Sequence, residues 1–285
     1  MRSICPSIFR AFSRLGGAAC FLAAAAVFLA ISPGLVHAQG YTQTNLVSDG
    51  FVPAAVTDPN LKNPWGLVQS SGSPFWASDQ GADVSTLYKG NGAIVPLVVA
   101  IPTAATPPNG PTGIVFNGGS GFVVTSTSRT SPSLFLFADL NGSIYGWNGG
   151  AGNTLADVGA TVTGGALTGL AINASQTNLY AANFTPTGGI LEFDSAFKPV
   201  ATTFTDASLP AGYEPYNVAD INGTIFAAYE PMQAGRPLQG AGNGIIAEFN
   251  DSTGAFIKNL VGGGQLDDPW GMALAPADFG AFSND

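Results

Sequence analysis

The sequence predicts an all-β fold of the propeller type, in which four-stranded sheets are arranged like blades around a central axis. The chain contains 38 Gly and 20 Pro, and only 9% of its residues are charged. This composition favours short strands joined by tight turns over solvated helices. A motif at 61–67, Leu-Lys-Asn-Pro-Trp-Gly-Leu, returns at 266–272 as Leu-Asp-Asp-Pro-Trp-Gly-Met. An internal repeat of short strands is the main signature of this fold.

Three weaker copies of the motif lie between the two strong ones, at 110–114, 166–170 and 214–218. The residues at the Trp position of the five copies are Trp65, Thr112, Thr168, Tyr216 and Trp270. Successive copies are about 50 residues apart, the length that a blade of four strands needs.

The first four copies are each followed by apolar runs that are separated by Gly- and Asn-containing turns, the pattern of β-hairpins. The expected strands are 75–81 and 85–88 after the first copy, 122–125, 134–138 and 143–147 after the second, 179–183 and 189–194 after the third, and 224–229 and 245–250 after the fourth.

After the fifth copy only residues 270–276 resemble a strand, and near the start of the chain residues 41–47 can add one more. We therefore expect about four full blades and part of a fifth. This chain would then be a C-terminally truncated form of a longer propeller, and the resemblance described below implies that the parent is of the six-bladed type.

The N-terminal segment predicts export. Arg2, Arg10 and Arg14 precede an apolar run at 15–31, and a cleavage-like triplet ends at Ala38. An uncleaved membrane anchor is the alternative, since the run is only slightly short of a span. The expected organisation is a signal peptide at 1–38 and one propeller domain at 39–285, which is secreted, periplasmic or attached to the cell surface.

Removal of the signal peptide would leave a chain without Cys or His, because Cys5, Cys20 and His37 all lie within it. Six basic residues would remain against 18 acidic ones, a net charge of −12. This inventory excludes Ser-His-Asp and Cys-His catalysis, imidazole or thiolate zinc sites, and disulfides. The negative charge argues against nucleic acid and anionic membrane surfaces as partners.

Several runs together resemble an uncharacterised family of bacterial exported propellers, some of whose members carry a PEP-CTERM sorting signal. These runs are 41–49, 63–67, 111–117, 142–148 and 267–273. That family is similar in turn to NHL-repeat and gluconolactonase-type six-bladed propellers. The resemblance implies a fold and no established activity, since propellers host many functions.

The gluconolactonase resemblance implies a divalent cation, such as calcium, held by carboxylate and amide oxygens in the central channel. Hard-cation coordination of this kind needs no His. The residues near strand ends that could serve as ligands are Asp79, Asn183, Asn217, Asp220 and Glu230. Their spacing is not diagnostic of a metal site, and Asp and Asn at strand ends are ordinary turn formers, so we favour a role in turns or in hydrogen bonds between blades.

The Trp of the Pro-Trp-Gly motif has two interpretations. The structural one, which we favour, places the ring between stacked blades while the neighbouring Gly lets the innermost strand pass close to the axis. The functional one makes it a platform for a sugar or another ring. For the whole chain the sequence favours an extracellular binding or structural module, with a glycan or a protein as ligand. A divalent-metal-dependent hydrolase is the alternative, so whether the protein is an enzyme stays open.

Overall fold

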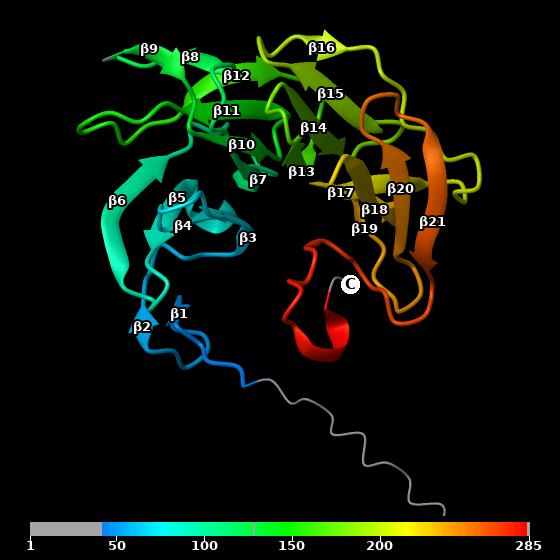
Figure 1. Ribbon diagram of the computed structural model, residues 1–285, viewed down its shortest axis with the longest axis horizontal. Coiled ribbons are helices and arrows are strands. Elements are labelled where there is room, and N and C mark those ends of the chain that lie inside the picture. Colours follow the sequence, from blue (N-terminus) through cyan, green and yellow to red (C-terminus); the bar gives the residue numbers. More distant parts are fainter. Residues whose placement is uncertain (1–41, 128, 284–285) are drawn as a thin grey trace, which may run out of the picture. The chain divides into compact units, whose positions relative to one another are not determined.

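The first four copies of the repeat each form the innermost strand of an antiparallel sheet (Figure 1). The computed structural model describes residues 42–127 and 129–283. The expected signal peptide lies outside these residues, and the compact unit begins at Gln43. Figure 1 shows the four sheets side by side along an arc, with the strands that carry the motif on its inner side.

In each sheet the four strands follow one another in chain order from the inside outwards. The first sheet consists of β3 (Pro64–Val68), β4 (Phe75–Asp79), β5 (Val84–Tyr88) and β6 (Ile94–Ala100). The second consists of β7 (Pro111–Phe116), β10 (Phe135–Asp139), β11 (Ser143–Trp147) and β12 (Asp157–Thr161). The third consists of β13 (Leu167–Ile172), β14 (Asn178–Asn183), β15 (Ile190–Asp194) and β16 (Pro199–Val200). The fourth consists of β17 (Tyr213–Ile221), β18 (Thr224–Gln233), β20 (Ile245–Asn250) and β21 (Phe256–Gly262), with β19 (Arg236–Pro237) paired to β18.

These sheets confirm the predicted all-β class and its four-stranded units, and they are compatible with a propeller. Within the described part of the chain the sheets form an open arc and not a closed ring. No helix in residues 42–127 and 129–283 is long and apolar enough to span a membrane.

Three expectations about individual strands need correction. The strand expected at 122–125 exists as β8 (Val123–Thr125), but it pairs with β9 (Thr130–Pro132) in a small separate hairpin and does not join the second sheet. Residues 270–276 are irregular, because no neighbouring strand pairs with their backbone. Of the described residues in 41–47 only Val47 is in a strand, β1 (Val47–Ser48), which runs parallel to β2 (Val56–Thr57).

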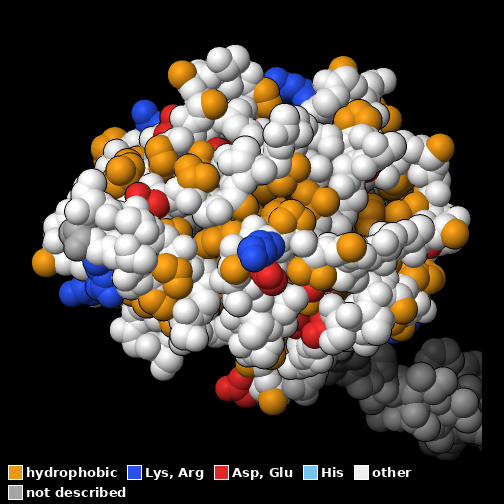
Figure 2. All heavy atoms as spheres, turned by 90° about the horizontal axis from the view of Figure 1, so that it is seen from above, with side chains coloured by type: hydrophobic (Ala, Val, Ile, Leu, Met, Phe, Trp, Pro, Cys, Tyr) orange, Lys and Arg blue, Asp and Glu red, His pale blue; other side chains and the backbone are white. Residues whose placement is uncertain are grey.

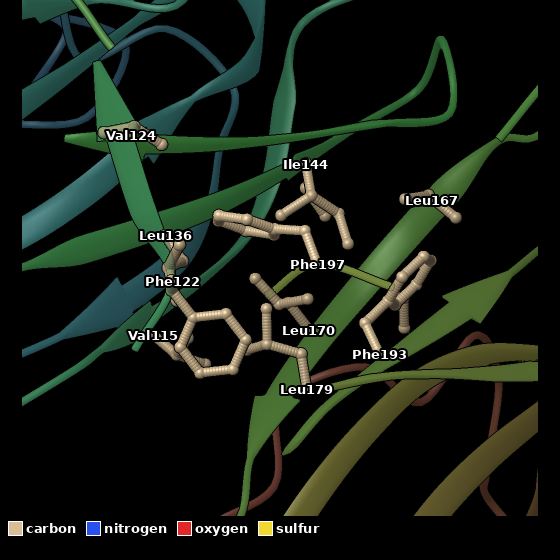
Figure 3. Packing of buried hydrophobic residues seen from close by; sticks show 12 residues of the cluster. Val115, Phe122, Val124, Leu136, Ile144, Leu167, Leu170, Leu179, Phe193 and Phe197 are labelled. Carbon is tan, nitrogen blue, oxygen red and sulfur yellow. The ribbon is translucent and has the colours of Figure 1, made fainter. Parts of the chain in front are cut away.

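Hydrophobic side chains fill the space between successive sheets in three clusters. Figure 3 shows the cluster between the second and third sheets, where Phe122 and Phe197 meet edge to face with their centroids 5.3 Å apart. The first core cluster lies between the first and second sheets. In it the ring of Trp76 stacks on that of Phe135, with 4.0 Å between their centroids. Close packing of large side chains between sheets stabilises the stack without disulfides.

The motif glycines allow the inner strands to approach one another closely. A methyl group on Gly66 would lie 2.7 Å from the carbonyl oxygen of Thr112 in the next inner strand. A methyl group on Gly113 would likewise clash with the backbone of Gly169 and Leu170, and one on Gly169 would clash with Asn217. The predicted role of these glycines beside the axis is therefore confirmed in the first three copies.

Candidate functional site

The inner strands surround a central channel that is lined by equivalent positions of all five motif copies. Its cavity has a volume of about 620 Å³. The lining residues are 65–68 from the first copy, 113–116 from the second, 170–172 from the third, 217–220 from the fourth and 270–273 from the fifth. The segment after β21 thus reaches the channel although it forms no strand (Figure 1).

A smaller pocket of about 290 Å³ shares Trp65 and Trp270 with this channel. We call it the aromatic pocket; its lining residues are Asn63, Pro64, Trp65, Tyr216, Asp268 and Trp270. The three aromatic residues are half-buried, so each keeps part of its ring open to solvent. Two of them come from inner strands and the third comes from the irregular C-terminal segment.

The rings of the aromatic pocket meet edge to face. The centroid of Trp65 lies 5.8 Å from that of Trp270, with an angle of 81° between the planes, and 5.9 Å from that of Tyr216, with an angle of 66°. The ring of Phe184 also meets that of Tyr216 edge to face, with their centroids 5.0 Å apart. Such edge-to-face pairs are favoured by the ring quadrupoles. Trp65 therefore lines a pocket and is not part of the three clusters between the sheets, although it does pack against rings of two other motif copies.

A β-bulge lies at two of these rings, Trp65 and Tyr216, in the aromatic pocket. In all four sheets the register between the first and second strands shifts at the Trp position of the motif. A bulge bends the strand and re-aims the side chain at that point. Trp65 and Tyr216 occupy this position in the first and fourth sheets, whereas Thr112 and Thr168 occupy it in the second and third. Sequence alignment of the copies found the position but not the bulge.

Two hydrogen bonds hold Trp270 against the inner strands. The indole Nε1–H of Trp270 donates to the carbonyl oxygen of Thr168 at 2.8 Å. The amide Nδ2 of Asn217 donates to the carbonyl oxygen of Trp270. Asn217, a predicted metal ligand, thus has its amide group engaged by the protein itself.

A buried acid or amide ends the second strand of three sheets, opposite the residue that precedes the bulge. Asp79 pairs with Pro64, Asp139 with Pro111, and Asn183 with Leu167. Sequence reasoning chose Asp79 and Asn183 and missed Asp139. The run 135–139 ends in Ala-Asp much as 75–79 ends in Ser-Asp, and this similarity could have revealed it.

Asp139 and Asn183 hold local backbone in place. Asp139 Oδ1 accepts hydrogen bonds from the backbone N–H groups of Asn141 and Ser143, both at 2.9 Å, across the β10–β11 turn. Asn183 Oδ1 accepts from the backbone N–H of Ala166 at 3.0 Å. These contacts are the turn-forming role that the sequence favoured for such residues.

Asp79 is fully buried, and only one of its two carboxylate oxygens has a hydrogen-bond partner. Its Oδ2 accepts a hydrogen bond from the Thr86 hydroxyl at 2.7 Å, while its Oδ1 has no hydrogen-bond partner. Burial raises the pKa of Asp79 to about 7, and the neighbouring charge of Asp58 adds to the rise while Thr86 opposes it. Asp58 in turn accepts from the Tyr88 hydroxyl at 2.9 Å.

Glu230 is also fully buried, and neither of its carboxylate oxygens accepts a hydrogen bond of normal geometry. Burial raises its pKa to about 7, as do the charges of Asp268 and Asp267, and the backbone N–H of Asp268 lowers it in part. The charges of Asp268 and Glu230 also contribute to raising the pKa of Tyr216 to about 12, after the larger effect of burial. Glu230 thus lies close behind the aromatic pocket.

The five predicted metal ligands are not gathered at one place. Asn217 and Asp220 line the channel, and Asp220 Oδ1 accepts from the backbone N–H of Gly223 at 3.1 Å within the β17–β18 turn. Asp79 and Asn183 have separate partners in the first and third sheets. In residues 42–127 and 129–283 no group of three or more Asp, Glu, His or Cys side chains is placed to hold a metal ion.

Two relatives with curated sequences come from Acanthamoeba polyphaga mimivirus. Uncharacterized protein R648 is 30% identical over 247 residues, which are 82% of this chain and 60% of that protein. Uncharacterized protein L690 is 28% identical over 245 residues, which are 82% of this chain and 65% of that protein. The chain therefore spans less than two thirds of the length of either relative. No protein-family model matches the chain.

Two solved structures share part of the architecture. Hydrazine synthase of Kuenenia stuttgartiensis matches 77% of this chain and 52% of its own with a TM-score of 0.49 and 16% identity. An inactive virginiamycin B lyase from Staphylococcus aureus, bound to quinupristin, matches 69% of this chain and 56% of its own with a TM-score of 0.45 and 11% identity. The sheets and their register make the architecture propeller-like.

Proposed function

We propose that this chain is an exported propeller-type binding module whose ligand site is the aromatic pocket. One observation carries the proposal: Trp65, Tyr216 and Trp270, which are far apart in the sequence, converge on one pocket and stay half-exposed there. Folding normally buries such rings, and exposed aromatic groups in a concave site are typical of ligand binding. The other motif copies place threonine at the same position, so the aromatic wall is local and not a general need of the repeat.

The surface supports a role in binding outside the cell. Figure 2 shows a face on which Lys, Arg, Asp and Glu are sparse and exposed hydrophobic side chains are spread among uncharged polar groups. A glycan or a protein remains the expected class of natural partner. The six-bladed type and the export of the chain stay predictions, and N-terminal sequencing of secreted protein tests the second, with Gln39 as the expected first residue.

Tryptophan fluorescence tests the binding function directly. The other two tryptophans, Trp76 and Trp147, are buried in the first core cluster, so a ligand in the aromatic pocket should change mainly the emission of Trp65 and Trp270. We expect a saturable change with at least one member of a panel of monosaccharides and small amines. Trp65→Ala should abolish the change, and Phe282→Ala, which removes an aromatic ring that is 56% exposed elsewhere, should preserve it. Saturation that survives Trp65→Ala would contradict the proposal.

A divalent-metal-dependent hydrolase is the second candidate, and one observation favours it. Glu230 is a fully buried carboxylate without a hydrogen-bond partner, a state that a bound cation would relieve. The test is calorimetric titration with Ca²⁺ followed by assay of lactone and ester hydrolysis. If calcium binds, Glu230→Gln removes that binding and hydrolysis depends on calcium, the protein is a hydrolase and the proposal of a binding module is wrong.

A further inference from the structure

We propose that the aromatic pocket binds an organic cation, specifically a substituted ammonium group. This inference rests on the proposed function and names the ligand class of the same site. Two features support it: the mutual orientation of the rings, and the carboxyl groups beside them that no protein cation pairs.

The orientation of the rings suits a cation. Trp65 is nearly perpendicular to Trp270 and strongly inclined to Tyr216, at 81° and 66°. Rings that meet in this way form a corner, and a group seated in the corner touches the electron-rich face of at least one ring. Corners of Trp and Tyr are the setting in which proteins bind quaternary and methylated ammonium groups.

The carboxylates supply negative charge without a protein cation to balance it. Asp268 lines the aromatic pocket, and its Oδ1 is buried without a hydrogen-bond partner. Glu230 lies behind it, fully buried, with both oxygens unpartnered. Among the described residues the one ion pair joins Lys258 to Glu248, away from this cluster. A ligand cation would therefore meet carboxyl groups that no protein cation pairs, and it would favour the ionised form of Glu230, whose pKa is raised to about 7.

The aromatic wall argues against calcium, because aromatic rings supply none of the six to eight oxygen ligands that this ion requires. Two polar groups of the wall are already engaged by the protein: the indole N–H of Trp270 donates to Thr168, and the side-chain amide of Asn63 donates to Gln80 Oε1 at 2.7 Å. Whether the ligand is charged or a neutral sugar is decided by the choice of ligands in the test below.

The test compares choline with 3,3-dimethyl-1-butanol, which has the same shape but carries no charge, by titration calorimetry of the full chain. We expect choline to bind at least tenfold more tightly than the neutral analogue. Asp268→Asn and Trp65→Ala should each weaken choline binding by about tenfold or more. The matched controls Asp278→Asn, from the same C-terminal segment, and Phe282→Ala should change it by less than about twofold, because both residues are exposed outside the pocket.

The possible outcomes separate this inference from the proposed function. If the neutral analogue or methyl glucoside binds as tightly as choline, and Trp65→Ala weakens both, the pocket is a binding site but not one for cations. If Ca²⁺ alone binds and displaces choline, the inference is overturned in favour of a metal. If neither choline nor any panel compound binds, both proposals fail. Should Trp65→Ala not fold, as judged by its thermal melt, Asp268→Asn carries the test alone.

Discussion

Trp65 and Trp270 hold the same position in the first and last copies of the repeat, and their rings touch edge to face with centroids 5.8 Å apart. The motif that marks the start of the arc thus contacts the motif that follows its last strand. Trp270 adds a hydrogen bond to Thr168, so the irregular C-terminal segment is fixed to the third inner strand as well as to the first.

This contact predicts that the two tryptophans are energetically coupled. Each ring is half-buried, so Trp65→Ala and Trp270→Ala should each destabilise the protein by less than the roughly 3–5 kcal/mol that is typical of a fully buried aromatic. The double variant should lose about 0.5–1.5 kcal/mol less than the sum of the two single variants, because the pair contact is lost only once. Urea denaturation of the four proteins measures this coupling, and strict additivity would show that the rings do not interact.

The glycines of the two strong motif copies should differ in how much a substitution by alanine lowers the stability of the protein. Gly66→Ala would place a methyl group 2.7 Å from both Ile114 Cγ2 and the carbonyl oxygen of Thr112, whereas Gly271→Ala would meet no atom within 4 Å. Overpacking of this kind commonly destabilises a protein by about 1–3 kcal/mol. We therefore expect a clearly lower melting temperature for Gly66→Ala and almost no change for Gly271→Ala. Equal effects would mean that the close approach of β3 to β7 is not needed for stability.

Much of the fold followed from the sequence because the repeat fixes it. The motif copies marked the four inner strands, and the apolar runs after them marked the second and third strands, since both kinds of strand are buried. The outer strands β6, β12, β16 and β21 escaped prediction. Strand β6 is a partly buried apolar run that could have revealed it, whereas β16 has only two residues and β21 is apolar but exposed along its whole length.

The site was only partly predictable. Sequence alignment placed Trp65, Tyr216 and Trp270 at one position of the repeat, but the meeting of their rings depends on the bulges and on the irregular path of residues 270–276. Glu230 was chosen for its oxygen atoms alone, and its burial beside Asp268 depends on how the C-terminal segment lies against β18. Long-range placement of this kind leaves no trace in the local pattern of residues.

Asp139 provides a test of the turn-forming interpretation. Asp139→Ala removes the acceptor for two backbone N–H groups, those of Asn141 and Ser143, in a buried turn. Leaving such donors unpaired should destabilise the protein by about 1–3 kcal/mol. Chemical denaturation measures the change, with Asp278→Ala as the exposed control. A variant as stable as the parent would show that water replaces the carboxylate at this turn.

Asp79 occupies the equivalent place in the first sheet, but replacing its carboxylate should raise the stability of the protein at alkaline pH, whereas replacing Asp139 should lower it. Its folded-state pKa of about 7 lies above the ordinary value of 3.8. Below the ordinary value both the folded and the unfolded chain hold the proton, and the group costs the fold no ionisation energy. Between the two values the unfolded chain loses its proton first, so stability falls as the pH rises. Above about pH 7 both states are ionised, and the folded protein bears the full penalty of a buried charge.

Asp79→Asn removes that charge while it keeps an oxygen that can accept from Thr86. We expect the variant to be more stable than the parent at pH 8, by up to about 4 kcal/mol, and close to it in stability at about pH 4. Urea denaturation at several pH values gives both stabilities, and the difference between them should grow as the pH rises through the range from 4 to 7. The exposed Asp278→Asn should show no such growth. If Asp79→Asn instead destabilises the protein equally at every pH, the carboxylate makes a contact that the amide cannot, and Asp79 belongs with Asp139 as a turn-forming residue.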